Sequence, residues 1–175
     1  CGACTHAQRA VRLKSASFKL LHVSDAHIHP TEDSCRDVPE SAHGCNGTNT
    51  SAFVSSVARD EQPDLIAFTG DSIDRDSSPA PTQAMDSLYG VAVASGIPWG
   101  ASLGNHESEV RTMSRDDIYR YIVQMPGADL SYHGPVAASP GNFYVDLLAP
   151  APLAASVGSD VVVARLVFFD SRDDA

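Results

Sequence analysis

Short apolar runs alternate along the chain with longer stretches whose apolar residues recur at helical spacing. Runs bounded by polar or turn residues predict β-strands, and recurrence every three or four residues predicts helices. The predicted strands are residues 18–23, 65–69, 98–103, 142–148 and 161–170. The predicted helices are residues 51–59, 83–95 and 114–124.

The order of these elements indicates the class of fold. A predicted helix separates each of the first three strands from the next, which is the pattern of a parallel sheet with helical crossovers. An Ala- and Pro-rich linker, residues 149–157, joins the last two strands without a predicted helix, so we expect them to be antiparallel. The sequence therefore predicts an α/β domain over residues 17–175, incomplete at its C-terminus, after an irregular arm at residues 1–16.

Three polar signatures stand where apolar runs end. They are Asp25-Ala26-His27, Gly70-Asp71 and Gly104-Asn105-His106-Glu107. Loops that leave the carboxyl ends of neighbouring parallel strands converge on one crevice, so residues far apart in the sequence can meet there. The two glycines support this interpretation, because a residue without Cβ lets the chain turn sharply beside a bound ion.

The residue types in these signatures are those of a two-metal hydrolytic site. Such a site needs a carboxylate that bridges two ions about 3.5 to 4 Å apart, with further imidazole, carboxylate or carbonyl ligands. Asp71 is the candidate bridge. Asp25 and His27 are candidates for chelating one ion, and Asn105 for binding the other. His106 stands next to a ligand and is the candidate for protonating the leaving oxygen.

Composition limits the expected partners. The chain has 175 residues and a formal net charge of -10 at pH 7, with a pI near 4.9. An acidic surface repels a phosphate backbone, so nucleic acid is not expected as the main partner. A small phosphorylated substrate would meet the same repulsion unless bound cations reversed the local charge. No apolar stretch approaches the roughly 20 residues of a membrane-spanning helix, so we do not expect a membrane as a partner. The oligomeric state stays open.

Cysteines and sequons bear on the cellular compartment. Cys35 and Cys45 enclose a Pro- and Gly-containing loop that a disulfide would close. Glycosylation sequons begin at Asn46 and Asn49 beside this loop. Both features favour a secreted protein or one of the secretory pathway, with a cytoplasmic location as the alternative. Asn49 or Thr50 is also a candidate N-cap for the helix that follows.

The three signatures, in this order, resemble those of the calcineurin-like metallophosphoesterase superfamily. The flanking segments FKLLHVSDAH, PDLIAFTGD and IPWGASLGNHE are similar to its purple acid phosphatase-related branch. Each motif alone is weak evidence, but all three in order at strand ends are a strong signal. The resemblance implies a four-layer αββα sandwich, of which this chain would be the N-terminal part. It also implies two iron, manganese or zinc ions, attack on phosphorus by a metal-bound hydroxide, and phosphomonoesters as the expected substrates.

One position departs from the purple acid phosphatase pattern. That branch has a Tyr three residues after the bridging Asp, where this chain has Asp74. The segment from Gly70 to Arg75 instead resembles the Gly-Asp-x-Val-Asp-Arg segment of serine/threonine phosphatases. That likeness implies that Asp74 orients His106 and that Arg75 contacts the phosphate. The alternative is that Asp74 and Arg75 belong to a solvated acidic loop.

The resemblance also implies ligands that this sequence does not contain. The family completes its site with a His and a Gly-His-x-His pair from later strands, and the sequence ends before either. We therefore expect the 175-residue chain alone to bind metal weakly and to turn over poorly. Two alternative functions stay open: a phosphodiesterase or nuclease of the same superfamily, and a non-catalytic binding module that keeps the fold.

Overall fold

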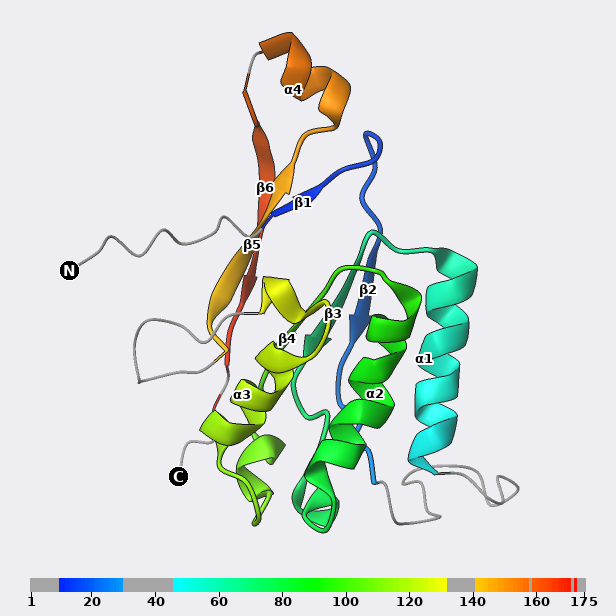
Figure 1. Ribbon diagram of the computed structural model, residues 1–175, viewed down its shortest axis with the longest axis vertical. Coiled ribbons are helices and arrows are strands. Elements are labelled where there is room, and N and C mark those ends of the chain that lie inside the picture. The colour runs from blue at the N-terminus through cyan, green and yellow to red at the C-terminus, as the bar shows by residue number, and fades with distance from the viewer. Residues whose placement is uncertain (1–9, 30–45, 132–140, 158, 171, 173–175) are drawn as a thin grey trace, which may run out of the picture.

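The computed structural model describes residues 10–29, 46–131, 141–157, 159–170 and 172, whose strands form two three-stranded sheets. The strand order is β2-β3-β4 in the first sheet and β1-β5-β6 in the second. Helices α1 and α2 lie side by side over the first sheet (Figure 1). All four cysteines lie outside the described residues, so the predicted disulfide stays a prediction.

The first sheet is parallel, and two of its three strands are deeply buried. Its strands are β2 (Leu20–Val23), β3 (Leu65–Thr69) and β4 (Trp99–Ser102). Four of the five residues of β3 and all four of β4 are buried. Strands covered on both faces have nearly continuous apolar sequences, which is why these two runs contain so few polar residues.

The helices begin close to where the sequence predicts, with one difference in capping. Helix α1 (Gly47–Glu61) begins after Asn46, whose side chain accepts a backbone hydrogen bond of 3.0 Å in the first turn. The N-cap is therefore neither Asn49 nor Thr50, and the helix is longer than expected at both ends.

The bounds of the other two predicted helices, α2 and α3, match the predictions closely. Helix α2 (Pro81–Ser95) has Pro at its start, where the missing N–H costs no hydrogen bond. Helix α3 (Arg115–Gln124) follows Ser114, whose side chain caps it. Within the described part of the chain, no helix combines the length and the apolar character that crossing a membrane requires.

The second sheet is mixed. Strand β1 (Ala10–Arg12) is parallel to β5 (Phe143–Leu148), and β6 (Val162–Phe168) is antiparallel to β5, as expected for the last two strands. Two expectations differ from the structure. Residues 10–12 form a strand within the predicted irregular arm, because they pair with a strand far along the chain. The predicted linker contains a short helix, α4 (Ala151–Val157).

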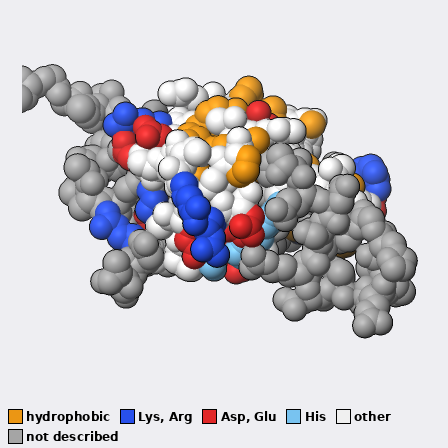
Figure 2. All heavy atoms as spheres, turned by 90° about the horizontal axis from the view of Figure 1, so that it is seen from below, with side chains coloured by type: hydrophobic (Ala, Val, Ile, Leu, Met, Phe, Trp, Pro, Cys, Tyr) orange, Lys and Arg blue, Asp and Glu red, His pale blue; other side chains and the backbone are white. Residues whose placement is uncertain are grey.

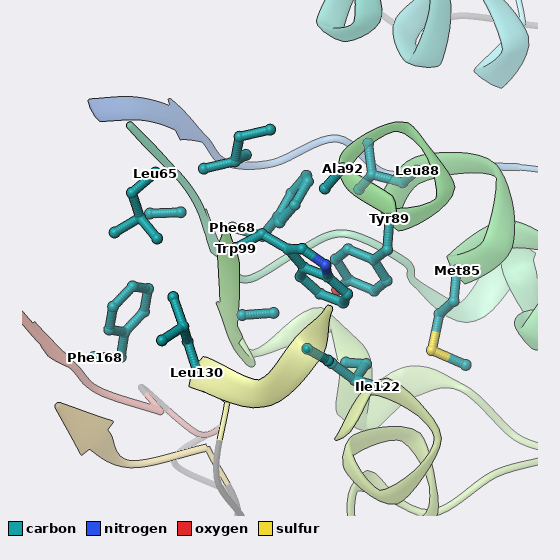
Figure 3. Packing of buried hydrophobic residues seen from close by; sticks show 14 of the residues in the cluster. Leu65, Phe68, Met85, Leu88, Tyr89, Ala92, Trp99, Ile122, Leu130 and Phe168 are labelled. Carbon is teal, nitrogen blue, oxygen red and sulfur yellow. The ribbon is translucent and has the colours of Figure 1, made fainter. Parts of the chain in front are cut away.

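The core fills the spaces between the helices and the first sheet and between the two sheets. Figure 3 shows the ring of Trp99 beside that of Tyr89 from α2; the two rings stack with centroids 5.4 Å apart. On the other face of β4, a Cβ at Gly100 would lie 3.2 Å from the Phe143 ring, so a glycine lets the second sheet pack closely. A helical layer on a sheet that packs against another sheet confirms the predicted α/β class and its layered architecture.

Candidate metal centre

The loops after β2, β3 and β4 meet at the carboxyl edge of the first sheet. The backbone N–H of Asp25 donates to the Gly70 carbonyl at 3.2 Å, and the N–H of His27 donates to the carbonyl of Asp71 at 2.9 Å. The backbone N–H of His106 donates to Asp71 Oδ1 at 2.9 Å. The three signatures therefore converge, as expected for loops at the ends of neighbouring parallel strands.

Gly70 and Gly104 permit this close contact between loops. Gly70 has a φ of 92°, and a Cβ built on it would lie 2.3 Å from the backbone nitrogen of Gly104. A Cβ built on Gly104 would lie 2.2 Å from Asp71 Oδ1. A larger residue at either position would push the loops apart and displace the Asp71 carboxylate.

Backbone strain is concentrated at the predicted ligands. Three of the five non-glycine residues with positive φ in the described part of the chain are Asp25, His27 and Asp71, at 55°, 42° and 50°. A left-handed conformation costs a residue with a side chain about 1 to 3 kcal/mol and persists only where the surrounding structure imposes it. The clustering singles out this edge of the sheet independently of its side-chain chemistry.

Imidazole and carboxylate groups gather at this edge. His27, Asp71 and His106 each offer a ligand atom, and these atoms lie within 4.8 Å of one another. The carboxyl ends of β2, β3 and β4 point to the face seen in Figure 2, which shows His side chains beside acidic and basic ones. Imidazole and carboxylate donors suit zinc, iron or manganese. His27 and Asp71 therefore fit a metal ion, and His106 lies beside them.

The other two predicted ligands are more exposed. The carboxylate of Asp25 lies outside the 4.8 Å group and accepts a hydrogen bond from the hydroxyl of Ser24. Asn105 immediately precedes the 3-10 helix η2 (His106–Glu109), and its side chain is exposed. The structure thus brings His27 and Asp71 together with His106, whereas Asp25 and Asn105 are exposed and their binding of metal stays a prediction.

Asp74 pairs with two histidines of the loop after β2. Its Oδ2 lies 3.0 Å from Nδ1 of His27 and 3.3 Å from Nε2 of His29. Its Oδ1 accepts a hydrogen bond of 2.8 Å from the Asp76 backbone, which fixes the carboxylate in this direction. The implied pairing of Asp74 with His106 is therefore not the pairing that this structure shows. His29, Asp74 and Asp76 form a second group of candidate ligands, also within 4.8 Å.

The charge of Asp74 follows from these contacts. Burial disfavours the carboxylate, but the hydrogen bonds from His27 and from the Asp76 backbone, together with the nearby imidazoles, outweigh burial and lower the pKa of Asp74. Arg75 begins the 3-10 helix η1 (Arg75–Ser77) and is exposed, so its contact with phosphate stays a prediction.

His106 lies between acidic groups. Its Nδ1 is 3.1 Å from Glu109 Oε1, an ion-pair distance without hydrogen-bond geometry. Burial disfavours the charged imidazole, but the carboxylates of Glu109 and Asp71 outweigh it and raise the pKa of His106. A raised pKa keeps more of the imidazole protonated near neutral pH, which suits donation of a proton to a leaving group.

Glu107 has a role that the sequence left open. Its side chain is buried, and Oε2 accepts hydrogen bonds from the backbone N–H groups of Gly104 at 2.8 Å and Asp71 at 3.2 Å. Oε1 accepts a third, from Ser72, at 2.8 Å. One carboxylate therefore ties the loop after β3 to the loop after β4. The sequence signal was the Glu that directly follows His106, whereas its backbone partners depend on the fold.

A parallel sheet with these groups at its carboxyl edge is typical of metal-binding α/β proteins. The profile of the family named calcineurin-like phosphoesterase matches residues 18–171. The chain belongs to this family.

Relatives place it near purple acid phosphatases, as the resemblance implied. The chain is 33% identical to "Probable inactive purple acid phosphatase 29" of Arabidopsis thaliana over 91% of its own length and 41% of that protein. It is 34% identical to "Probable inactive purple acid phosphatase 28" of the same plant, over 90% and 42%. It is 33% identical to "Phosphatase DCR2" of Saccharomyces cerevisiae, over 60% and 18%.

The chain thus spans about two fifths of the length of the two plant relatives. Among solved structures, a dimetal phosphatase from Danio rerio aligns with 64% of this chain and 35% of its own, with 18% identity and a TM-score of 0.44.

Proposed function

We propose that this chain forms part of the active site of a metal-dependent phosphoester hydrolase that acts on small phosphomonoesters. The observation that carries the proposal is the meeting of His27, Asp71 and His106 at the carboxyl edge of the first sheet. Membership of the phosphoesterase family supports phosphoester chemistry in general.

The proposed cofactors are two ions of iron, manganese or zinc, which when bound activate water and neutralise the phosphoryl oxygens. In this proposal Asp71 would be a ligand of both ions, Asp25 and His27 would hold one, and Asn105 would hold the other. With a net charge of -10, the chain needs such cations to attract an anionic substrate. His106 then donates a proton to the leaving oxygen.

Asp74 acts through His27 in this proposal. The lowered pKa makes Asp74 a carboxylate, which only accepts hydrogen bonds, so Nδ1 of His27 must be the donor across their 3.0 Å contact. In the neutral imidazole a donating Nδ1 leaves Nε2 as the nitrogen that would bind a metal. The same arrangement explains why a carboxylate is useful at a position where purple acid phosphatases have Tyr.

Hydrolysis before and after metal loading tests the proposal. The protein is stripped with a chelator, reloaded with manganese, zinc or iron, and assayed with 4-nitrophenyl phosphate and with bis(4-nitrophenyl) phosphate. We expect the monoester to be hydrolysed only after loading. Faster hydrolysis of the diester would overturn the monoesterase assignment. Because the chain spans two fifths of its plant relatives, the assay includes the longest form that the gene encodes.

A non-catalytic metal-binding module is the second candidate. Two relatives carry names that include "probable inactive", whereas the yeast relative is named a phosphatase. Metal binding at stoichiometric levels without hydrolysis of either ester, in the longest form of the protein, would favour this second function.

A further inference from the structure

Both backbone groups of Gly104 are held by side chains. Its N–H donates to Glu107 Oε2 at 2.8 Å, and its carbonyl accepts a hydrogen bond from Nη1 of Arg115 at 2.6 Å. Gly104 immediately precedes Asn105 and His106, so its conformation sets the direction in which these residues leave β4.

Gly104 needs such support because no other residue fits there. A Cβ would meet Asp71 Oδ1 at 2.2 Å, so the position requires glycine. Glycine has the widest conformational freedom of all residues, and that freedom would spread the positions of the residues that follow. Hydrogen bonds on both sides of Gly104 remove it.

Arg115 connects three parts of the molecule. From the start of α3 its Nη1 reaches the Gly104 carbonyl and, at 2.9 Å, the hydroxyl of Ser108 in η2. Its Nη2 pairs with the carboxylate of Asp170, which follows β6 and whose side chain is fully buried. The Asp170 backbone N–H in turn donates to Asn142 Oδ1 at 2.7 Å. The planar fork of arginine suits such simultaneous contacts, which a lysine cannot reproduce.

We propose that Arg115 is a positioning residue for the metal centre: it holds the Gly104 carbonyl, and Asp170 at the end of the second sheet holds Arg115. This inference rests on the proposed function, because it concerns the loop that carries Asn105 and His106. Arg115 acts through this loop and not on the substrate. The second sheet thereby contributes to the geometry of a site built on the first.

Two sets of variants test this role without leaving a buried charge unpaired. Arg115→Lys keeps the charge beside Asp170 but loses the fork. The double variant Arg115→Met/Asp170→Asn removes both charges of the pair. Removing only one would leave the other charge buried and unpaired, which would destabilise the fold whatever the role of Arg115. The matched controls lie on the same helix, where Arg120 pairs with Asp116 at 2.6 Å on the surface. They are Arg120→Lys and Arg120→Met/Asp116→Asn.

Cobalt(II) titration followed by visible absorption reports on the metal centre without turnover. Replacing groups that orient metal ligands typically weakens metal binding about 10- to 100-fold. We expect a loss in that range for the double variant, a smaller loss for Arg115→Lys, and a changed cobalt spectrum in both. Amide hydrogen exchange should accelerate at residues 104–106, while the amides of α3 should stay protected. The two controls should match the unmodified protein in both measurements.

Equal cobalt affinity and equal spectra in the Arg115 variants and their controls would overturn the proposal. Exchange that accelerates over the whole chain would also overturn it, since Arg115 would then merely stabilise the fold. A separate result would overturn the proposed function. If the protein binds cobalt and shows the Arg115 effect but hydrolyses no ester, the positioning role of Arg115 stands and the enzymatic function does not. A protein that binds no cobalt loses both.

Discussion

The two sheets of this protein differ in burial and in what their ends carry. Strands β3 and β4 of the first sheet are covered on both faces, and their carboxyl ends bear the candidate metal centre. In the second sheet, most of β6 is exposed, including Val163 at 49% and Val167 at 53%. The helix between β5 and β6, α4, lies away from the first sheet (Figure 1).

This difference shows where the fold can hold side chains in fixed positions. At the end of the first sheet, Gly70 and Gly104 bring two loops into contact, and Glu107 and Arg115 bond to their backbones. A site with metal ligands from three loops requires such mutual support. The second sheet supplies support through Asp170, while its outer face carries no comparable cluster among the described residues.

The largest expected effect is that of Asp71→Asn on hydrolysis. Asp71 is the proposed bridging ligand, and its loss would remove several kcal/mol of stabilisation, so we expect the rate of the longest form of the protein with 4-nitrophenyl phosphate to fall on the order of 10³-fold or more. The fold should persist, as measured by circular dichroism. Asp86→Asn on α2 is the matched control, because Asp86 pairs with Tyr121 at an exposed position. Full activity of Asp71→Asn would remove Asp71 from the site.

Trp99→Ala tests the burial of the first sheet. Trp99 is fully buried and stacks on Tyr89, so its truncation should lower the free energy of unfolding by about 3 to 5 kcal/mol, as measured by urea denaturation. Phe169, directly after β6, is 73% exposed, and Phe169→Ala should change the free energy by about 0.5 kcal/mol or less. Equal losses would show that the two sheets are not buried as differently as the structure indicates.

Glu107→Gln should weaken metal binding about 10- to 100-fold. The amide NH₂ of the new residue would replace one of the two accepting oxygens, so either Ser72 or both Asp71 and Gly104 would have a backbone N–H without its acceptor. Cobalt titration measures the affinity, and Glu61→Gln at the exposed end of α1 is the control. Unchanged affinity would mean that the two loops hold their positions without Glu107.

The sequence predicted more of the first sheet than of the second, for a physical reason. Residues 65–69 form a strand with the predicted bounds, since a strand buried on both faces is apolar throughout. Strand β1 was missed because its three residues are ordered by pairing with β5 and carry no pattern of their own. Helix α4 was missed because Ala and Pro in a short segment also suit a linker.

The candidate site shows the same limit. The meeting of His27, Asp71 and His106 follows from three neighbouring parallel strands, and the alternation of strands and helices predicted that these strands are parallel. The partner of Asp74 depends on which way its side chain is fixed by the cap of η1, and the contacts of Arg115 depend on how α3 packs. Neither is encoded in local spacing: the predicted partner of Asp74 was His106, where the structure has His27 and His29, and no contact was predicted for Arg115.

The smallest expected effect comes from making the same substitution, Val→Thr, on each of the two faces of the second sheet. Val145 is fully buried on β5, whereas Val167 on β6 is 53% exposed. Val→Thr keeps the shape and the β-branch of the side chain, so both variants retain strand propensity, and they differ only in where the hydroxyl is placed. Val145→Thr should lower the free energy of unfolding by about 1 to 3 kcal/mol, and Val167→Thr by about 0.5 kcal/mol or less. If Val167→Thr is as costly as Val145→Thr in urea denaturation of the longest form of the protein, the outer face of β6 is buried there.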